Sequence, residues 1–215
     1  MKFVYLGLLF LITILHLAAS YKNSREYRLL TKGLILPMIW GFYLESGAAV
    51  LPALVAALIF SWAGDLLLMW PGVKWFVIGG CSFIISHILF IVVYAGLTDF
   101  SLVPVWAIVL AACVFAFAVG LVFRKLSPHL PSRLVLPMSV YLLINGAMNC
   151  FAVFRAMSAG TFGSVVTAFG AALFFASDTT LFFVRFNKKS RMKSHFLPML
   201  TYILGEFLIV LGMVI

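Results

Sequence analysis

The sequence predicts an all-α integral membrane protein, because of its composition and the length of its apolar segments. Of its 215 residues, 65% are hydrophobic and 10% are charged, and the mean hydropathy is +1.18. Soluble domains carry about 25% charged residues, so this chain cannot cover a water-exposed surface. The apolar stretches run for about 17 to 25 residues, as bilayer-spanning helices do, whereas strands of a membrane β-barrel alternate over about ten residues. We therefore expect one polytopic helical domain over residues 1–215.

Eight transmembrane spans are predicted, with Gly, Pro and charge clusters marking their ends. They lie near residues 3–20, 33–44, 48–69, 75–97, 102–123, 134–155, 161–184 and 196–215. The first ends in Leu17-Ala18-Ala19-Ser20, which resembles a signal-peptide cleavage site, but cleavage would put the following basic cluster on the wrong side of the membrane. We expect this span to be retained. The second is short, and residues 29–31 can lengthen it while Lys32 extends toward the interface.

Three spans begin with the same short pattern, which hints at an internal repeat. Leu36-Pro37-Met38, Leu136-Pro137-Met138 and Leu197-Pro198-Met199 each follow a basic loop, and proline is tolerated near a helix start. In addition, Gly64-Asp65 in span three and Ser177-Asp178 in span seven lie at similar depths. A parallel four-plus-four repeat is one interpretation, and chance similarity among apolar helices is the other.

Basic residues gather in alternate loops, which predicts the orientation of the chain. The odd-numbered loops hold 13 of the 15 Lys and Arg residues, namely Lys22, Arg25, Arg28, Lys32, Lys74, Arg124, Lys125, Arg133, Arg185, Lys188, Lys189, Arg191 and Lys193. The even-numbered loops hold Glu45, Asp99 and Arg155. Because Lys and Arg accumulate on the cytoplasmic side, we expect both termini on the non-cytoplasmic side. Lys2 does not fit this pattern.

The basic character and the cysteines do not indicate a soluble binding function. A net charge of +9 is compatible with nucleic acid, but a nucleic-acid site needs its basic residues on one solvated fold, and here they follow the membrane topology. Cys81, Cys113 and Cys150 all fall within apolar segments, without metal-type spacing or an even number for disulfides. We interpret them as buried packing residues and expect no nucleic-acid partner.

Five ionisable residues lie within predicted spans, where charge is costly and usually functional. They are His16, Asp65, His87, Asp178 and Glu206. At 1.5 Å per helical residue, the two aspartates lie roughly 8 to 10 Å from the cytoplasmic ends of their spans. His87 and Glu206 lie deeper, toward the midplane, and His16 lies near the end of span one. Together, the deep groups predict a cavity open to the cytoplasm.

Polar neighbours lie at helical spacing from these groups, which supports a hydrated cavity. Such spacing aligns Ser61 with Asp65, His87 with Tyr94, Tyr141 with Asn145 and Asn149, and Tyr202 with Glu206. Interhelical hydrogen bonding is the competing interpretation for the asparagines and tyrosines.

A pair of buried carboxyl groups predicts acid–base chemistry at Asp65 and Asp178. Burial disfavours ionisation of a carboxylic acid, and a second carboxylate nearby does so further, which leaves a proton donor near neutral pH. Carboxylate pairs of this kind serve reactions that pass through an oxocarbenium ion. The sequence has no nucleophile elbow, phosphate loop or zinc-binding helix motif. A metal held by the two aspartates with His87 and Glu206 is a weaker alternative.

Several short motifs, taken in order, resemble one family of membrane proteins. They are Thr31-Lys32 in span two, Ser61-Trp62-Ala63-Gly64-Asp65-Leu66-Leu67-Leu68 in span three, Ser86-His87-Ile88-Leu89 in span four, Tyr141-Leu142-Leu143-Ile144-Asn145-Gly146 in span six, Ser177-Asp178 in span seven and Thr201-Tyr202 in span eight. Over nearly the whole chain these motifs resemble the YhhN family of lysoplasmalogenases. The chain departs from the family pattern at Gly33, Phe90 and Glu206, where Pro, Tyr and Gln are more usual.

The resemblance implies a hydrolase that cleaves the vinyl-ether bond of lysoplasmalogens to a fatty aldehyde and glycerophosphoethanolamine or glycerophosphocholine, without a cofactor. Asp65 and Asp178 would then be catalytic, in either order. The expected substrate-binding residues are Lys32, His87, Tyr141, Asn145, Asn149, Tyr202 and Glu206. Lys32 would meet the lipid phosphate, with ordinary positive-inside anchoring as its alternative role. We expect a lysophospholipid substrate and a position in the plasma membrane of a bacterial cell.

Two other classes of function compete with a hydrolase. A proton-coupled transporter or channel would use the same buried carboxylates, but alternating access needs polar routes from both sides. The external halves of most spans are almost uniformly apolar, with Asn149 and Arg155 of span six as the exception. A scaffold without chemistry would tolerate Asn in place of Asp65 and Asp178.

Overall fold

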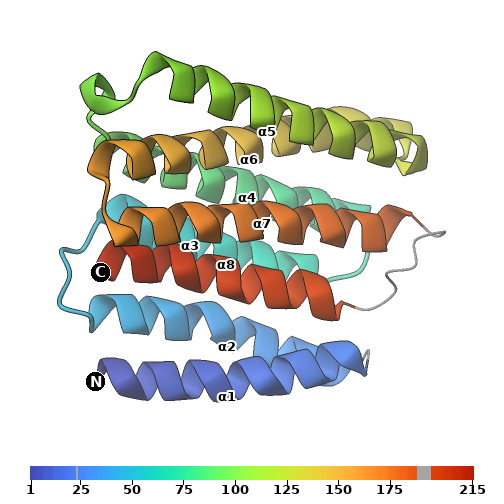
Figure 1. Cartoon of the computed structure of the whole chain (residues 1–215). Coiled ribbons are helices and arrows are strands. Elements are labelled where there is room, and N and C mark those ends of the chain that lie inside the picture. Colours follow the sequence, from blue (N-terminus) through green and yellow to red (C-terminus); the bar gives the residue numbers. More distant parts are fainter. Residues whose placement is uncertain (23, 188–194) are drawn as a thin grey trace.

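The computed structural model describes residues 1–22, 24–187 and 195–215. These residues form a bundle of eight α-helices in which each helix runs antiparallel to the next along the chain (Figure 1). The helices are α1 (Lys2–Tyr21), α2 (Arg25–Leu44), α3 (Pro52–Leu68), α4 (Val73–Gly96), α5 (Val105–Leu126), α6 (Ser132–Ala159), α7 (Phe162–Phe186) and α8 (Phe196–Val214), with short 3-10 turns η1 (Phe100–Leu102) and η2 (Ser127–His129). The predicted all-helical fold and the number of helices are confirmed for the described residues.

Six of these helices are long and apolar enough to cross a membrane, and the chain is an integral membrane protein. The two others are α3, which has 17 apolar residues, and α2, which is 20 residues long but carries charge in its first half. Both lie alongside the longer helices in the bundle (Figure 1). That arrangement supports the prediction that α2 and α3 span the membrane as well.

Two helical segments extend beyond the predicted spans. Helix α2 begins at Arg25 rather than near residue 33, because a charged turn outside the apolar stretch still makes helical backbone hydrogen bonds, such as Arg28 N–H to the carbonyl of Ser24 at 3.2 Å. Helix α6 continues to Ala159 and ends at Gly160, whose φ of +61° suits a left-handed C-terminal cap. Arg155, which the sequence assigned to a loop, therefore lies inside α6 and is buried.

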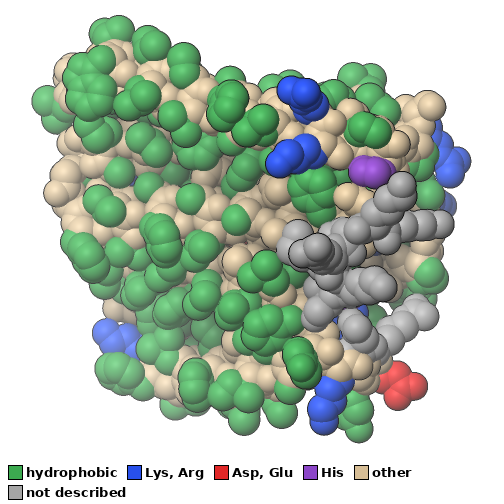
Figure 2. Space-filling model, turned by 45° about the vertical axis from the view of Figure 1, so that its right-hand side comes forward, with side chains coloured by type: hydrophobic (Ala, Val, Ile, Leu, Met, Phe, Trp, Pro, Cys, Tyr) green, Lys and Arg blue, Asp and Glu red, His purple; other side chains and the backbone are tan. Residues whose placement is uncertain are grey.

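The termini lie together at one end of the bundle, and the odd-numbered loops lie at the other (Figure 1). Figure 2 shows hydrophobic side chains over most of the face in view, with most of the visible Lys and Arg toward one end. Lys188, Lys189, Arg191 and Lys193 of the seventh loop fall outside the described residues. The membrane side that this basic end faces stays a prediction, and so does the four-plus-four repeat.

Glycines bring two pairs of helices into close contact around the centre of the bundle. A Cβ atom on Gly170 of α7 would lie 2.7 Å from the backbone nitrogen of Ile209 in α8. On the other pair, a Cβ on Gly64 of α3 would lie 3.2 Å from the carbonyl oxygen of Gly79 in α4. Small residues at such contacts let membrane helices pack backbone to backbone. This packing positions Asp65, one residue after Gly64, and Asp178, two turns after Gly170.

The cysteines are not buried as predicted. Cys81 and Cys113 are exposed, and Cys150 is half-buried. Hydropathy cannot separate the interior face of a membrane helix from its lipid-facing side, because both are apolar.

Candidate functional site

A cavity of about 390 Å³ lies at the basic end of the bundle, between α2, α3, α4, α6, α7 and α8. Most of its wall is apolar, with contributions such as Leu68, Phe76, Met138 and Phe182. Its polar lining residues are Arg28, Lys32, Asp65, Tyr141, Ser177, Asp178, Arg185, His195 and Tyr202. A concave, mostly apolar pocket with a few convergent polar groups is the usual form of a small-molecule site.

Asp65 of α3 lies between a cation and a phenol. Its Oδ1 atom is 2.9 Å from Nζ of Lys32 in α2, and its Oδ2 atom accepts a hydrogen bond from the hydroxyl of Tyr202 in α8 at 2.8 Å. Asp65 is 2% exposed, and the side chain of Lys32 is 15% exposed. A buried ion pair needs such additional hydrogen bonds, because both charges have lost their hydration.

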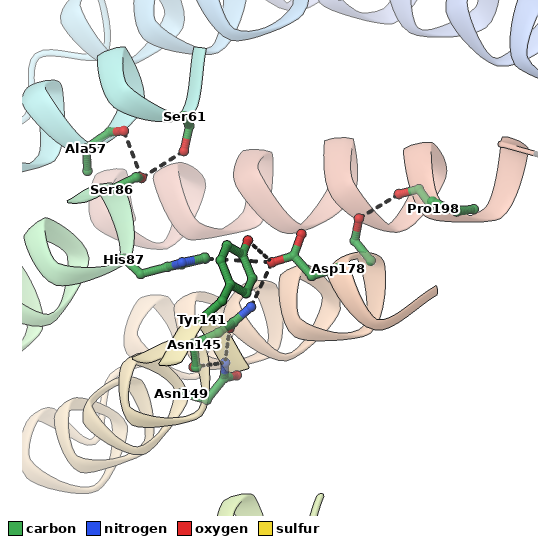
Figure 3. Close-up of polar contacts among 10 residues, drawn as sticks. Ala57, Ser61, Ser86, His87, Tyr141, Asn145, Asn149, Asp178 and Pro198 are labelled. Atoms are coloured by element: carbon green, nitrogen blue, oxygen red, sulfur yellow. Dashed lines mark hydrogen bonds and ion pairs between the residues drawn. The ribbon is translucent and has the colours of Figure 1, made fainter. Parts of the chain in front are cut away.

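Asp178 of α7 has neutral hydrogen-bond donors instead. Its Oδ2 atom accepts hydrogen bonds from the hydroxyl of Tyr141 at 2.6 Å and from Nδ2 of Asn145 at 2.8 Å, both from α6. Nε2 of His87 in α4 lies 3.8 Å from the same oxygen. Figure 3 shows His87, Tyr141 and Asn145 all pointing toward Asp178. The spacing of Tyr141 and Asn145, one turn apart on α6, lets both reach one carboxylate.

A second layer of polar side chains lies behind the cavity wall. The hydroxyls of Ser61 and Ser86 are 2.8 Å apart, and Ser86 also donates to the carbonyl of Ala57 at 2.9 Å (Figure 3). Asn149 donates to the backbone carbonyl of Asn145 at 2.9 Å, one turn deeper on α6. These contacts hold α3 against α4 and fix the side of α6 that faces Asp178.

Glu206 and His87 are fully buried in this layer. Neither ring nitrogen of His87 has a hydrogen-bond partner among the described residues, and Glu206 lies beside the hydroxyl of Ser61. Ser61 and Glu206 each lie one turn deeper than the Asp65–Tyr202 contact, on antiparallel helices α3 and α8.

The structure brings the predicted site residues together to different extents. Lys32, Asp65, Tyr141, Asp178 and Tyr202 line the cavity. His87 and Asn145 contact Asp178 from behind the lining, whereas Asn149 and Glu206 lie deeper and do not line the cavity.

His16 is remote from this cavity. It is fully buried, and its Nδ1 atom lies 2.7 Å from the hydroxyl of Thr31, so it joins α1 to α2 rather than facing the interface.

Sequence reasoning missed three residues at the mouth of the cavity. Arg28 and Arg185 were counted only as loop charges, and His195 carried no pattern at all. For the two arginines the available signal was helical spacing, because residues 28 and 32, and residues 178 and 185, share a helix face. Among the described residues, no three His, Cys, Asp or Glu side chains are grouped so that they could hold a metal ion.

Comparison with known proteins points to one family. The model of the YhhN family matches residues 27–213. A pig (Sus scrofa) protein named lysoplasmalogenase TMEM86B is 33% identical over 137 residues, which are 64% of this chain and 53% of the relative. The alignment thus spans about half of that relative's length. No solved structure matches this chain.

Proposed function

The chain belongs to the YhhN family, and on that basis we propose that it is a lysoplasmalogenase that hydrolyses the vinyl-ether bond of lysoplasmalogens. The observation that carries this proposal is the cavity in which Asp65 and Asp178 face one apolar space, each hydrogen-bonded by a tyrosine. The relative named lysoplasmalogenase supports the same reaction.

The proposed reaction begins with proton transfer from a carboxylic acid to the alkene carbon that does not carry the ether oxygen. This step forms an oxocarbenium ion, which a carboxylate stabilises. Water then adds to the cation and gives up a proton to that carboxylate, forming a hemiacetal. The hemiacetal collapses when its ether oxygen is protonated and its hydroxyl is deprotonated, which releases the fatty aldehyde and the glycerol hydroxyl. The residues present supply each proton transfer.

The surroundings of the two aspartates support a division of roles between them. The Lys32 ammonium lies 2.9 Å from Asp65 and stabilises its carboxylate, so Asp65 is suited to stabilise the cation and to accept the proton of water. Asp178 has neutral donors on one oxygen and no Lys or Arg at ion-pair distance among the described residues. We therefore assign Asp178 as the general acid that protonates the alkene carbon.

The apolar wall is suited to the single alkenyl chain of the substrate. Pockets for drug-sized ligands measure about 300 to 1,000 Å³, so a cavity of about 390 Å³ holds the reactive end of a lysolipid but not a long chain as well. Cys81 of α4 and Pro137 of α6 both line the cavity and are exposed, and a Cβ on Gly80 would meet nothing within 4 Å. We infer that the chain leaves the cavity there, between α4 and α6, and enters the lipid.

Aldehyde release from purified protein tests the proposal. Wild type is expected to release aldehyde from lysoplasmenylethanolamine with a chelator present, and Asp65→Asn and Asp178→Asn to lose about 100-fold or more, the range for removing an acid or base. Asp99→Asn is the matched control, because Asp99 is exposed in the loop between α4 and α5 and is expected to leave activity unchanged.

Two outcomes would contradict the proposal. Aspartate variants that keep full activity would remove the carboxylates from the mechanism. A wild type that is inert on both ethanolamine and choline lysoplasmalogens would overturn the activity, and proton flux in liposomes would then test the transporter alternative with the same variants.

A further inference from the structure

Three basic side chains converge at the mouth of the cavity from different helices. Arg28 lies one turn before Lys32 on α2, and Arg185 lies two turns beyond Asp178 on α7, so both arginines share a face with a central residue and line the cavity. His195, which precedes the first turn of α8, lines it as well.

The positive charge at this mouth is not neutralised by nearby acids. Asp65 and Asp178 are the only acidic residues among the described residues that line the cavity, and Asp65 is paired with Lys32 at 2.9 Å. No carboxylate in the described part of the chain lies within ion-pair distance of Arg28 or Arg185. The two guanidinium groups are therefore available to an anion from outside the chain.

These positive groups act on one another at the mouth, and Arg185 is held in place by a neighbouring ring. Burial, and then the positive charges of Arg28, Lys32 and Arg185, lower the pKa of His195 from 6.5 to about 4. In addition, the guanidinium of Arg185 lies 4.4 Å from the ring centroid of Phe76 on α4, a cation–π contact that restricts its position.

The chemistry and spacing of the mouth fit a phosphate group. Guanidinium groups bind phosphate oxygens in a bidentate manner, more specifically than an ammonium does. The seven residue steps from Asp178 to Arg185 rise about 10 Å along the helix, and an arginine side chain can reach back over part of that distance. In a lysoplasmalogen, six single bonds separate the vinyl carbon on oxygen from phosphorus, an extended length of roughly 7 Å.

We propose that Arg28 and Arg185 form a binding site for the phosphodiester of the lysolipid head group, which holds the vinyl ether at the two aspartates. This inference rests on the proposed function and deepens it, because it assigns recognition of the phosphate. It puts the phosphate contact one turn further out than Lys32, whose ammonium is engaged by Asp65. The same chemistry would also accept a free phosphate ion, so the experiment includes both sources.

The site is tested by comparing the kinetics of a substrate that carries the phosphate with those of one that lacks it. Aldehyde release is measured in detergent with lysoplasmenylethanolamine and with the phosphate-free 1-O-alkenylglycerol, for wild type, Arg28→Gln, Arg185→Gln and the double variant. Each single change is expected to raise KM for the phosphate substrate about tenfold, as for loss of one charge-assisted hydrogen bond, and to leave kcat/KM for the phosphate-free substrate unchanged. Arg124→Gln is the control, since Arg124 is exposed at the same end and does not line the cavity.

An equal loss on both substrates would overturn the proposal, because the arginines would then act on folding or on the aspartates. So would a loss of the same size in Arg124→Gln, which would indicate a general attraction between positive charge and lipid.

A binding measurement tests the phosphate site even if the wild type releases no aldehyde. The change in tryptophan emission on adding a saturated lysophosphatidylethanolamine is titrated, since Trp70 lines the mouth and its surroundings change when the site fills. Weaker binding by about tenfold in each arginine variant, but not in Arg124→Gln, supports the site whatever the activity. Unchanged binding in the double variant overturns it. Competition by glycerophosphoethanolamine alone assigns the head group as ligand, competition by inorganic phosphate as well assigns any phosphate, and competition by neither contradicts the proposal.

Discussion

The two aspartates of the cavity have the same side chain and different surroundings. Asp65 is bound by the Lys32 ammonium on one oxygen and by Tyr202 on the other, whereas Asp178 receives two hydrogen bonds from the neutral donors Tyr141 and Asn145 on a single oxygen. A cation stabilises the ionised form of a carboxyl group more strongly than a neutral donor does. Under the proposed mechanism, this difference suits two equivalent-looking residues to opposite halves of acid–base catalysis.

Both aspartates line the same cavity, which makes this asymmetry informative. Both lie on helices that pack closely against the next helix through glycines, α3 on α4 and α7 on α8. The asymmetry comes instead from the helix that precedes that of each aspartate, because α2 contributes Lys32 and α6 contributes Tyr141 and Asn145.

The largest expected effect in this comparison comes from removing the charged partner of Asp65. Lys32→Met leaves the Asp65 carboxylate buried without its counterion, and kcat for aldehyde release is expected to fall about 100-fold. Tyr141→Phe removes one neutral hydrogen bond from Asp178 and is expected to cost about tenfold or less. The measurement is kcat for both variants on lysoplasmenylethanolamine.

Lys22→Met provides the control for this pair, since Lys22 is exposed at the same end of the bundle. A larger loss in Tyr141→Phe than in Lys32→Met would reverse the roles assigned to the two aspartates.

An intermediate effect is expected where the cavity meets the lipid. Cys81→Trp would fill the opening between α4 and α6, so kcat/KM for a long-chain lysoplasmalogen is expected to fall roughly tenfold, while a short-chain analogue that fits inside the cavity is cleaved normally. Cys113→Trp on α5 is the matched control, because Cys113 is exposed but does not line the cavity. Equal loss for both chain lengths would show that the chain does not pass this point.

The smallest effect is expected at the third buried carboxyl group. Glu206 is fully buried and does not line the cavity, and glutamine has nearly the same shape, so the replacement leaves the packing around it unchanged. Glu206→Gln is expected to keep aldehyde release within about threefold of wild type. A loss as large as that of Asp65→Asn would add Glu206 to the catalytic groups and would favour a proton route through the bundle.

Several features of the fold followed from the sequence because they depend on composition along the chain. Apolar length predicted the helices, and the alternation of basic loops predicted that the termini lie at one end of the bundle. Hydropathy did not predict that α2 begins at Arg25 or that Arg155 lies inside α6, because helical hydrogen bonds form in polar segments too. Arg155 is tolerated there because its Nη1 atom donates to the hydroxyl of Thr167 on α7 at 2.8 Å.

The sequence alone determined that this chain is a membrane helix bundle and that Asp65 and Asp178 are its exceptional residues, since both conclusions rest on the cost of charge in an apolar segment. Only the tertiary structure decided which partner each aspartate has. Lys32 precedes Asp65 by 33 residues, and Tyr202 follows it by 137, so no local spacing relates them. Contacts between helices depend on how the bundle packs, and that packing decides which charged and polar groups surround each aspartate. The periodicity of the sequence does not encode these contacts.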